Sequence, residues 1–407
     1  MGPLRGVTVL DLSRILAGPW ATQALADFGA TVIKIERPEG GDDTRGWGPP
    51  YLKFADGSES EESAYFASAN RGKQSVAIDF SRPEGQQIVR RLAGHADILV
   101  ENFKVGGLAR FGLAYHDLAE LNPRLIYCSI SAFGQSGPEA AAPGYDAMIQ
   151  GMGGLMSVTG LPDSAPGGGP QKVGIAVSDL MAGMYSLSAI LAALYEREHS
   201  QQGQWIDLAL LDSQVAWLAN QGLNFLTTGK APERHGTAHP NIVPYQAFAT
   251  ADGHLMLAVG NDRQFVKFCE AAGCAELARD ARYLTNKMRV SNRDTLVASL
   301  APVLHRRTTR SWLAALADSG VPCGPINDIA EVFAEPQVKY REMRIDLPHA
   351  LTGSAPGIRN PVLFSRTQLE YRTAPPALGQ DTAAVLKSVL DMSDSELTVL
   401  RAAGVVR

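Results

Sequence analysis

A single carboxylate, Asp179, stands at the start of a long apolar segment in the stretch K-V-G-I-A-V-S-D-L-M-A-G. The small and apolar residues behind it continue to Tyr195. Asp is a favoured helix N-cap, because its oxygen accepts backbone N–H groups of the first turn. A carboxylate with an ordinary pKa is also ionised at neutral pH and can act as a nucleophile without a general base. The stretch predicts a helix near residue 179 and leaves the role of the acid open.

Basic side chains lie next to several strand-like segments. Arg37 ends I-K-I-E-R, Arg71 and Lys73 lie in A-N-R-G-K-Q-S-V, and Lys104 and Arg110 follow V-E-N-F. Sheets of α/β proteins bind ligands at the carboxyl ends of their strands. Each cation alone is consistent with a solvated surface residue, whereas several cations at one sheet edge could bind a polyphosphate.

Motifs for metals and dinucleotides are weak in this chain. His235 and His239 are four positions apart, but Gly236 and Pro240 predict a loop there. The remaining histidines and the four cysteines have no metal-ligand spacing, so we expect no metal. The first predicted turn, D-L-S-R-I-L-A-G-P, lacks the three-glycine fingerprint of nicotinamide sites, although Glu36 stands where a ribose-binding acid would. A nicotinamide-dependent dehydrogenase is therefore a weak alternative.

The elements that must position these residues alternate between strand and helix. Strands separated by helix-length segments indicate parallel crossovers and an α/β sheet, and Val/Ile/Leu-rich strands indicate a sheet covered on both faces. We expect strands at residues 6–12, 30–36, 74–80, 97–103, 125–131 and 204–210. We expect helices at residues 17–29, 83–93, 381–390 and 393–401 and in the segment after Asp179. Irregular segments are expected at 134–171 and 227–245, and a separate α+β unit from 252 to about 319.

Composition limits the class of partner. The chain has 407 residues, of which 45% are hydrophobic and 19% charged, which is typical of globular proteins. A formal net charge of −5 gives no overall basic field for nucleic acid or anionic lipid. The apolar run from Leu180 to Tyr195 is shorter than the roughly 20 residues of a membrane span. Without a signal-peptide pattern or paired cysteines, we expect a cytoplasmic protein with neither nucleic acid nor membrane as a partner.

Many short pieces of the chain, in order, resemble one enzyme family. The resemblance is to the family III CoA-transferases, which include formyl-CoA transferase and carnitine CoA-transferase, and it covers almost the whole length. The pieces are V-L-D-L-S-R-I-L-A-G-P, F-G-A-T-V-I-K-I-E-R-P, N-R-G-K-Q-S-V-A-I-D, V-E-N-F, L-N-P-R-L-I-Y-C-S-I-S-A-F-G, G-Y-D, V-S-D-L-M-A-G, L-Y-E-R-E-H-S-Q-Q-G-Q-W-I-D and G-V-P-C-G-P-I-N-D.

The resemblance implies a fold and an assembly. It implies a Rossmann-like large domain with a parallel sheet, a smaller α+β domain, and a homodimer whose two chains are linked as rings. Residues 1–200 would form the first part of the large CoA-binding domain. Residues 201–334 would form linkers and the small domain, and residues 335–407 would return to the large domain.

The resemblance also implies roles for individual residues. Asp179 corresponds to the catalytic nucleophile, which would attack an acyl-CoA thioester to give a mixed anhydride and then an aspartyl-CoA thioester. The residues expected to bind CoA, the co-substrate, are Arg37, Arg71, Lys73, Ile78, Asn102, Phe103 and Arg110. The residues expected near the acyl group or the acceptor acid are Arg14, Leu16, Ala17, Tyr145, His235, Gly236 and His239.

The sequence leaves alternatives open for the substrate and for the type of reaction. Leu16 replaces a glutamine of formyl-CoA transferase, which argues against formate or oxalate. The segment H-G-T-A-H-P-N-I-V-P-Y-Q-A-F resembles the subgroup that uses succinyl-CoA and short dicarboxylic acids. An α-methylacyl-CoA racemase would need a histidine where G-Y-D has Tyr145, and tyrosine is a poor base at neutral pH. A protein that binds CoA without catalysis would have no use for Asp179.

Overall fold

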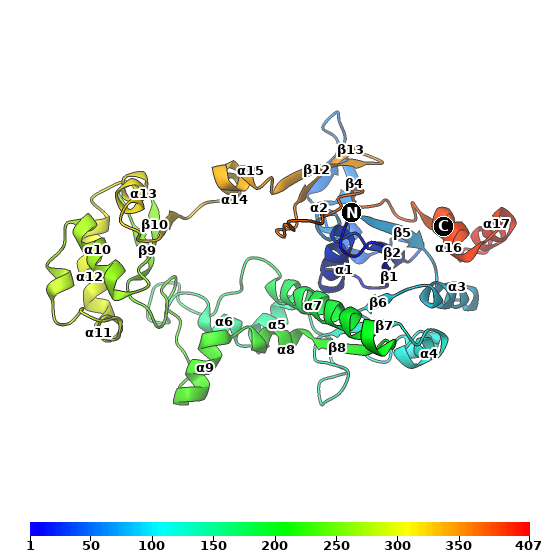
Figure 1. Ribbon diagram of the computed structural model, residues 1–407, viewed down its shortest axis with the longest axis horizontal. Helices are drawn as coiled ribbons and strands as arrows, with labels where there is room; N and C mark the ends of the chain where they lie inside the picture. Colours follow the sequence, from blue (N-terminus) through cyan, green and yellow to red (C-terminus); the bar gives the residue numbers. More distant parts are fainter. The chain divides into compact units, whose positions relative to one another are not determined.

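The computed structural model describes residues 1–407, which divide into two compact units (Figure 1). The larger unit comprises Met1–Leu155, Val173–Leu223 and Gln337–Arg407, and the smaller unit comprises Met156–Lys172 and Asn224–Pro336. The predicted boundary at residue 200 therefore falls inside the larger unit, because the strand that follows it joins the main sheet. The predicted return at residue 335 lies close to Gln337.

Six parallel strands form the main sheet, in the order β5-β2-β1-β6-β7-β8. Numbered along the chain, this is the order 3-2-1-4-5-6 of dinucleotide-binding folds. The order reverses between β1 and β6, and a crevice at the carboxyl ends of these two strands is where such sheets bind ligands. The strands are β1 (Thr8–Asp11), β2 (Thr31–Glu36), β5 (Lys73–Ala77), β6 (Ile98–Glu101), β7 (Ile126–Ser131) and β8 (Trp205–Ala209).

Helices cover both faces of the sheet, as the apolar strands predicted. Successive residues of β1 point to opposite faces, so Val9 joins one core and Leu10 the other. The Val9 core includes residues of α1 (Ala17–Asp27), α5 (Asp146–Met152), α7 (Val177–Ser200) and α8 (Leu210–Ala216). The Leu10 core includes residues of α3 (Pro83–Gly94), α4 (Tyr115–Leu121), α16 (Thr382–Leu390) and α17 (Asp394–Ala402).

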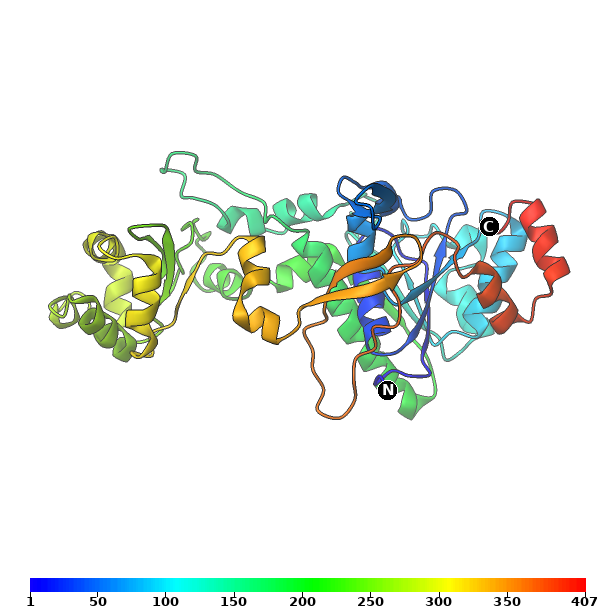
Figure 2. The ribbon, with the colours of Figure 1, turned by 90° about the horizontal axis from the view of Figure 1, so that it is seen from above.

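The C-terminal segment completes the larger unit. Figures 1 and 2 show α16 and α17, the last helices of the chain, beside α3. Their apolar residues close the Leu10 core, which explains why the chain returns to this unit after the smaller one. The remaining elements of this part are α2 (Ala64–Ala69) and two antiparallel hairpins, β3 (Tyr51–Lys53) with β4 (Glu59–Ser63) and β12 (Arg344–His349) with β13 (Gly353–Ile358).

The segment at 134–171 is less irregular than predicted. It contains α5 and the short helix α6 (Leu155–Val158). The many glycines and prolines around these helices mask them in the sequence, because both residue types ordinarily interrupt helices. Helix α5 begins at Asp146, and the carboxylate of Asp146 accepts the backbone N–H of Asp179. The start of α5 therefore lies next to Asp179.

Helix α7 is longer than the predicted apolar run. By length and composition alone its 24 residues could cross a membrane. Its buried residues include Ala182, Leu187 and Ile190, which pack in the Val9 core under the sheet. A central helix of a globular core passes the same composition test, and this packing gives α7 that role.

The smaller unit has the α+β texture predicted for it. Three antiparallel strands in the order β11-β10-β9 pack with helices around Phe265, Phe268 and Trp312. The strands are β9 (Tyr245–Ala249), β10 (His254–Ala258) and β11 (Cys323–Pro325). The helices are α10 (Asp262–Ala272), α11 (Asn286–Ser291), α12 (Arg293–Leu304), α13 (Thr309–Ala317) and α14 (Ile329–Ala334). Helices α9 (Ala219–Thr228) and α15 (Pro336–Tyr340) lie where the chain passes between the units.

Candidate active site

Asp179 lies in the first turn of α7, but it is not the cap residue. The N-cap is Ala176, whose side chain makes no capping bond, and Asp179 is the third residue of the helix. Asp146, the first residue of α5, supplies the missing acceptor. Its Oδ1 accepts the backbone N–H of Ser178 at 2.8 Å and of Asp179 at 3.3 Å. The capping interpretation of Asp179 is therefore wrong, and its own carboxylate is left for other contacts.

The environment of Asp179 changes its acidity. Burial raises the pKa of Asp179, the nearby charge of Asp146 raises it further, and the result is about 7. The sequence predicts an ordinary pKa for Asp179, because it does not show that a second acid, Asp146, lies beside it. At neutral pH the protonated and ionised forms of Asp179 are present in similar amounts. The ionised fraction increases as the pH rises through 7.

A cavity of about 410 Å³ in the larger unit contains Asp179 in its wall, and we call it the Asp179 cavity. Tyr145, the N-cap residue of α5, also lines this cavity and is 69% exposed. The wall also includes the turn before α1 and the residues that follow β6. These lining residues include Arg14, Leu16, Ala17, Asn102 and Phe103, all predicted site residues.

A second cavity of about 260 Å³ adjoins the first, since Arg14 and Phe103 line both, and we call it the arginine cavity. One wall is apolar and includes the fully buried Ile78. Phe80 contacts Phe103 and Phe111 edge-to-face, with ring centroids 5.8 and 5.6 Å apart. Both cavities lie where the carboxyl ends of β1 and β6 diverge, as the strand order predicts.

Cations line the polar side of the arginine cavity. Arg14 and Arg37 contact the two oxygens of Asp43, at 2.9 and 3.0 Å. Arg110 lies over the ring of Phe111, with its guanidinium carbon 4.5 Å from the ring centroid. Guanidinium groups bind phosphate through paired N–H donors, and an apolar wall can accept a planar heterocycle. The cavity thus has the chemistry to bind a nucleotide.

Arg71 and Lys73 do not reach this cavity, which corrects their predicted role. They lie at the amino end of β5, whereas the cavities lie at the carboxyl ends of the strands. Arg71 forms a buried ion pair with Asp27, with nitrogen–oxygen distances of 2.8 and 2.6 Å. The Lys73 ammonium is fully buried and donates to Asp11 at 3.0 Å and to Asn70 at 2.9 Å. Both cations therefore pair with buried carboxylates of the larger unit, Arg71 with Asp27 and Lys73 with Asp11.

The turn between β1 and α1, residues 13–17, forms one side of the Asp179 cavity. We call it the β1–α1 turn. The Asn102 amide bonds Arg14 twice: its oxygen accepts the Arg14 N–H at 2.8 Å and its nitrogen donates to the Arg14 carbonyl at 2.7 Å. The backbone N–H groups of Leu16 and Ala17, at the N-terminus of α1, have no protein acceptor. Such groups suit a developing negative charge in the cavity.

The residues of the 234–240 loop lie in the smaller unit, and none of them lines the two cavities. Arg234 forms an ion pair with Asp163. His239 stacks on Tyr245 with ring centroids 5.2 Å apart, and its Nδ1 accepts the Asn241 N–H at 3.1 Å. Burial and the charge of Arg293 lower the pKa of His239. The roles predicted for His235, Gly236 and His239 stay predictions.

Sequence reasoning missed several residues that support the turn. Lys34 and Asp42 form a fully buried ion pair at 2.9 Å beneath it. The stretch G-G-D-D-T-R after a strand was the available signal, because Asp followed two residues later by Thr is a turn pattern. The Oδ1 of Asp42 indeed accepts the Thr44 N–H at 3.0 Å. No group of three or more His, Cys, Asp or Glu side chains is arranged to bind a metal ion.

Residues 4–382 of the chain match CoA-transferase family III. The chain belongs to this family. As a CoA-transferase it is an enzyme that takes CoA thioesters as co-substrate, which confirms the resemblance seen in the sequence. The nucleotide chemistry of the arginine cavity and the carboxylate of the Asp179 cavity are consistent with such a co-substrate.

Individual relatives of this CoA-transferase are similar over nearly their whole length. The succinate–glutarate CoA-transferase of Agrobacterium fabrum is 51% identical over 94% of this chain and 95% of its own. The succinyl-CoA:glutarate CoA-transferase of Homo sapiens is 43% identical over 99% of this chain and 90% of its own. A crystal structure of a CaiB/BaiF family protein from Brucella suis superposes with a TM-score of 0.83 at 48% identity, covering 95% of this chain and 99% of that one.

Proposed function

We propose that this CoA-transferase moves CoA from succinyl-CoA to a short dicarboxylic acid such as glutarate, through covalent intermediates on Asp179. The observation that carries the proposal is the position of Asp179 in a cavity that adjoins an arginine-lined cavity at the sheet's reversal point. The names of the glutarate-using relatives support the choice of substrates.

The reaction proceeds in paired steps. The Asp179 carboxylate attacks the thioester carbonyl of the donor, the C–S bond breaks, and CoA leaves as a thiolate with a mixed anhydride on the enzyme. The thiolate then attacks the aspartyl carbonyl and releases the donor acid as a carboxylate, which leaves an aspartyl-CoA thioester. The acceptor carboxylate attacks this thioester, and the returning thiolate attacks the acceptor's carbonyl to give the new acyl-CoA and free Asp179. No oxidant, metal or net proton is needed.

The raised pKa of Asp179 helps the first step. An ordinary carboxylate leaves the tetrahedral intermediate far more readily than a thiolate, because the pKa of a thiol is about 8.5 and that of an Asp about 3.9. With Asp179 at a pKa of about 7, the two leaving groups become much closer in leaving ability. A larger share of the intermediates then expels thiolate and goes forward, at the cost of a smaller ionised fraction at neutral pH.

The β1–α1 turn supplies the electrostatic stabilisation. The oxygen of the attacked carbonyl gains negative charge in each step, and the N–H groups of Leu16 and Ala17 are donors without a protein acceptor in the same cavity. Leu16 offers only its backbone here, since its side chain has no amide. Donors of this kind contribute on the order of a hundredfold or more to the rate of acyl transfer.

CoA extends across both cavities in this proposal. Its adenine packs on Ile78 and the phenylalanine wall, and its phosphates contact Arg37, Arg110 and Arg14, with displacement of Asp43 from the two arginines it now contacts. Its pantetheine arm passes Phe103 and the Asn102 segment and brings the thioester to Asp179.

Assembly and location follow from the resemblance. The proposed active form is a homodimer of interlinked chains in the cytoplasm. Interlinked chains cannot separate while folded, so sedimentation at nanomolar concentration should detect no folded monomer. A folded monomer peak would rule out interlinking.

A panel of free acids tests the function. The protein is incubated with succinyl-CoA and, in turn, glutarate, malate, itaconate, butyrate and oxalate, and new acyl-CoA products are identified by mass. We expect glutaryl-CoA or another dicarboxylyl-CoA to form fastest. Butyryl-CoA forming faster than every dicarboxylyl-CoA would rule out the dicarboxylate preference, and no new thioester with any acid would rule out CoA transfer from succinyl-CoA.

One observation favours a second reaction, epimerisation of α-methylacyl-CoA, because a carboxylate with a pKa of about 7 is also a suitable base. In the segment G-Y-D the opposing position is occupied by Tyr145, and tyrosine side chains are ordinarily poor bases. Incubation of a 2-methylacyl-CoA in D₂O separates the reactions, since epimerisation incorporates deuterium at the α-carbon and CoA transfer does not.

A further inference from the structure

The β1–α1 turn contains an unusual backbone conformation. Ile15 has a φ of +70°, in the left-handed region. For a β-branched residue this conformation is unfavourable, because Cβ approaches the backbone carbonyl. Such strain persists only where surrounding contacts determine the local structure. The contacts around the turn therefore need to account for it.

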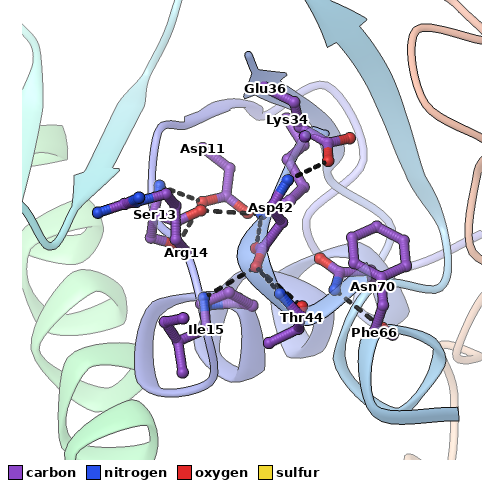
Figure 3. A network of polar contacts seen from close by, with 12 residues as sticks. Asp11, Ser13, Arg14, Ile15, Lys34, Glu36, Asp42, Thr44, Phe66 and Asn70 are labelled. Atoms are coloured by element: carbon purple, nitrogen blue, oxygen red, sulfur yellow. Dashed lines mark hydrogen bonds and ion pairs between the residues drawn. The ribbon is translucent and has the colours of Figure 1, made fainter. Parts of the chain in front are cut away.

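A buried ion pair supplies two of these contacts (Figure 3). Asp42 Oδ1 accepts the Ile15 N–H at 3.3 Å, and its Oδ2 accepts from the Lys34 ammonium at 2.9 Å. The same ammonium donates to the carbonyl of Ser13 at 2.8 Å. The two charged groups thus bond the backbone on both sides of Arg14, while neither side chain is exposed to solvent.

Both members of the pair stay charged in spite of their burial. Burial alone would raise the pKa of Asp42, but the Lys34 charge and the bonds from Thr44 outweigh it and lower that pKa. Burial alone would lower the pKa of Lys34, but the charges of Asp42 and Asp11 outweigh it and raise that pKa. A buried ion pair contributes little net stability compared with an apolar pair. Its value here lies in the direction of its hydrogen bonds.

A third contact comes from the opposite side of the turn. The Asn102 amide, after β6, bonds both the N–H and the carbonyl of Arg14. The backbone of Ser13, Arg14 and Ile15 is therefore bonded by Asn102, Lys34 and Asp42 from separate segments of the chain, and Asp11 Oδ1 also accepts the Ser13 N–H at 2.9 Å. Directly after these residues come Leu16 and Ala17, whose N–H groups have no acceptor.

We infer that Asp42 and Lys34 are positioning residues, which keep Ile15 in the left-handed conformation and so aim the Leu16 and Ala17 N–H groups at the carbonyl that Asp179 attacks. The inference rests on the proposed function for its catalytic consequence. Neither side chain touches the reacting atoms, and both act through the backbone of the turn.

The test removes the ion pair without leaving an unpaired buried charge. The double variant Asp42→Ala/Lys34→Met should fold, because replacing both partners of a buried pair is tolerated far better than replacing one. Its kcat for transfer from succinyl-CoA to glutarate should fall roughly tenfold to a hundredfold, as when an oxyanion donor is displaced. Its Kd for CoA should change less than about threefold, because Lys34 and Asp42 line the arginine cavity without exposing their side chains and the double replacement conserves its net charge.

A rescue experiment separates positioning from a general structural role. Adding Ile15→Gly to the double variant should restore most of the lost kcat, since glycine adopts positive φ without a Cβ clash. Adding Ile15→Ala is the matched control: it removes nearly the same side chain, keeps Cβ, and should restore nothing. The kcat of each Ile15 substitution is also measured in the wild-type background. The effect of losing the isoleucine side chain from the cavity wall can then be subtracted from the kcat of the combined variants. Equal kcat for the glycine and alanine forms in the double-variant background would overturn the inference.

Hydrogen exchange does not depend on enzyme activity, so it tests the positioning role separately from the proposed function. Hydrogen exchange of the peptide containing Arg14 and Ile15 should be faster in the double variant, because the Ile15 N–H loses its acceptor Asp42 while the Arg14 N–H keeps Asn102. Unchanged exchange would overturn the positioning role whatever the reaction is. If wild-type protein shows no CoA transfer but the exchange result holds, the proposed function is wrong and the positioning of the turn stands. Should the double variant not fold, Asp42→Leu/Lys34→Met, which also removes both charges but fills the volume of the Asp42 side chain, is tested in the same way and should lose at least threefold in kcat.

Discussion

The carboxylate of Asp146 accepts the backbone N–H of Asp179 over 3.3 Å, so one acid caps the helix end that carries the other. The same oxygen accepts the N–H of Ser178 at 2.8 Å, and the second oxygen accepts from the amide of Gln150 at 2.7 Å. Asp146 therefore fixes the position of Asp179 and raises its pKa at the same time. The two effects can be separated by experiment.

The pH dependence of transfer should report this pair. Activity requires ionised Asp179, so kcat should rise with pH through about 7 in the wild type. Asp146→Asn keeps an oxygen that can cap α7 but removes the like charge, so the pKa of Asp179 should fall and the midpoint should move to lower pH. Stopped assays of acyl-CoA product between pH 5 and about 9 measure both profiles. A midpoint that stays in place would mean that burial alone sets the acidity of Asp179.

Replacement of the nucleophile gives the second prediction. Asp179→Ala should bind CoA with an affinity close to that of the wild type, because its contacts with CoA are confined to the thioester end. Transfer should fall by several orders of magnitude, because no other carboxylate lines the Asp179 cavity.

Trapping of the intermediate completes this test. Wild-type protein incubated with succinyl-CoA and then with hydroxylamine or borohydride should give a modified peptide that contains Asp179, detected by mass. The control is the same treatment without succinyl-CoA. Normal turnover in Asp179→Ala, or modification of a different carboxylate, would exclude Asp179 as the nucleophile.

Arg37 lines the arginine cavity and Arg71 does not, and both outcomes have one physical origin. Strand and helix periodicity indicate which segments form the parallel sheet, and a parallel sheet brings the residues after its strands to one edge. Arg37 and Arg110 follow strands and reach the cavity, whereas Arg71 precedes one and lies towards the opposite edge. A basic residue near a strand is informative only when its side of the strand is considered.

Contacts between residues far apart in the chain could not be predicted from the sequence, for a different reason. Asp146 and Asp179 are 33 positions apart, and Asn102 and Arg14 are 88 apart. No local periodicity relates such positions, and only the packed fold brings a carboxylate or an amide to a particular backbone group. The raised pKa of Asp179 depends on burial and on such a pair, and composition and spacing show neither, so they predicted an ordinary pKa.

The two classes of arginine should respond differently to removal. Arg37→Ala and Arg110→Ala should raise the Kd for CoA roughly tenfold to a hundredfold, because a charge-assisted bond to phosphate contributes about 1.5–3 kcal/mol. Their melting temperatures should change little, since both side chains lie at the cavity rim. Isothermal titration with CoA and thermal unfolding measure the two quantities.

Arg71→Ala is the matched contrast for that prediction. It leaves Asp27 buried without its partner, so the protein should lose about 3–5 kcal/mol of stability. The Kd for CoA of the folded fraction should stay close to that of the wild type. If Arg71→Ala weakened CoA binding as much as Arg37→Ala without loss of stability, the division between rim and interior would be wrong.

The last prediction concerns the acceptor acid and the loop at 234–240. His239→Ala should raise the KM for glutarate much more than the KM for butyrate, if His239 donates to the distal carboxylate. Its Nδ1 accepts the Asn241 N–H at 3.1 Å, so the neutral ring carries its proton on Nε2, which is the atom available to donate to an anion. Losing a donor to an anion costs roughly 1.5–3 kcal/mol, and an acid without the second carboxylate has nothing to lose. His239→Gln is the control variant, because its amide can still donate. Both acids are assayed on all three proteins with succinyl-CoA as the only donor. Equal effects on the two acids would mean that His239 shapes its loop, through its stacking on Tyr245, without contacting the anion.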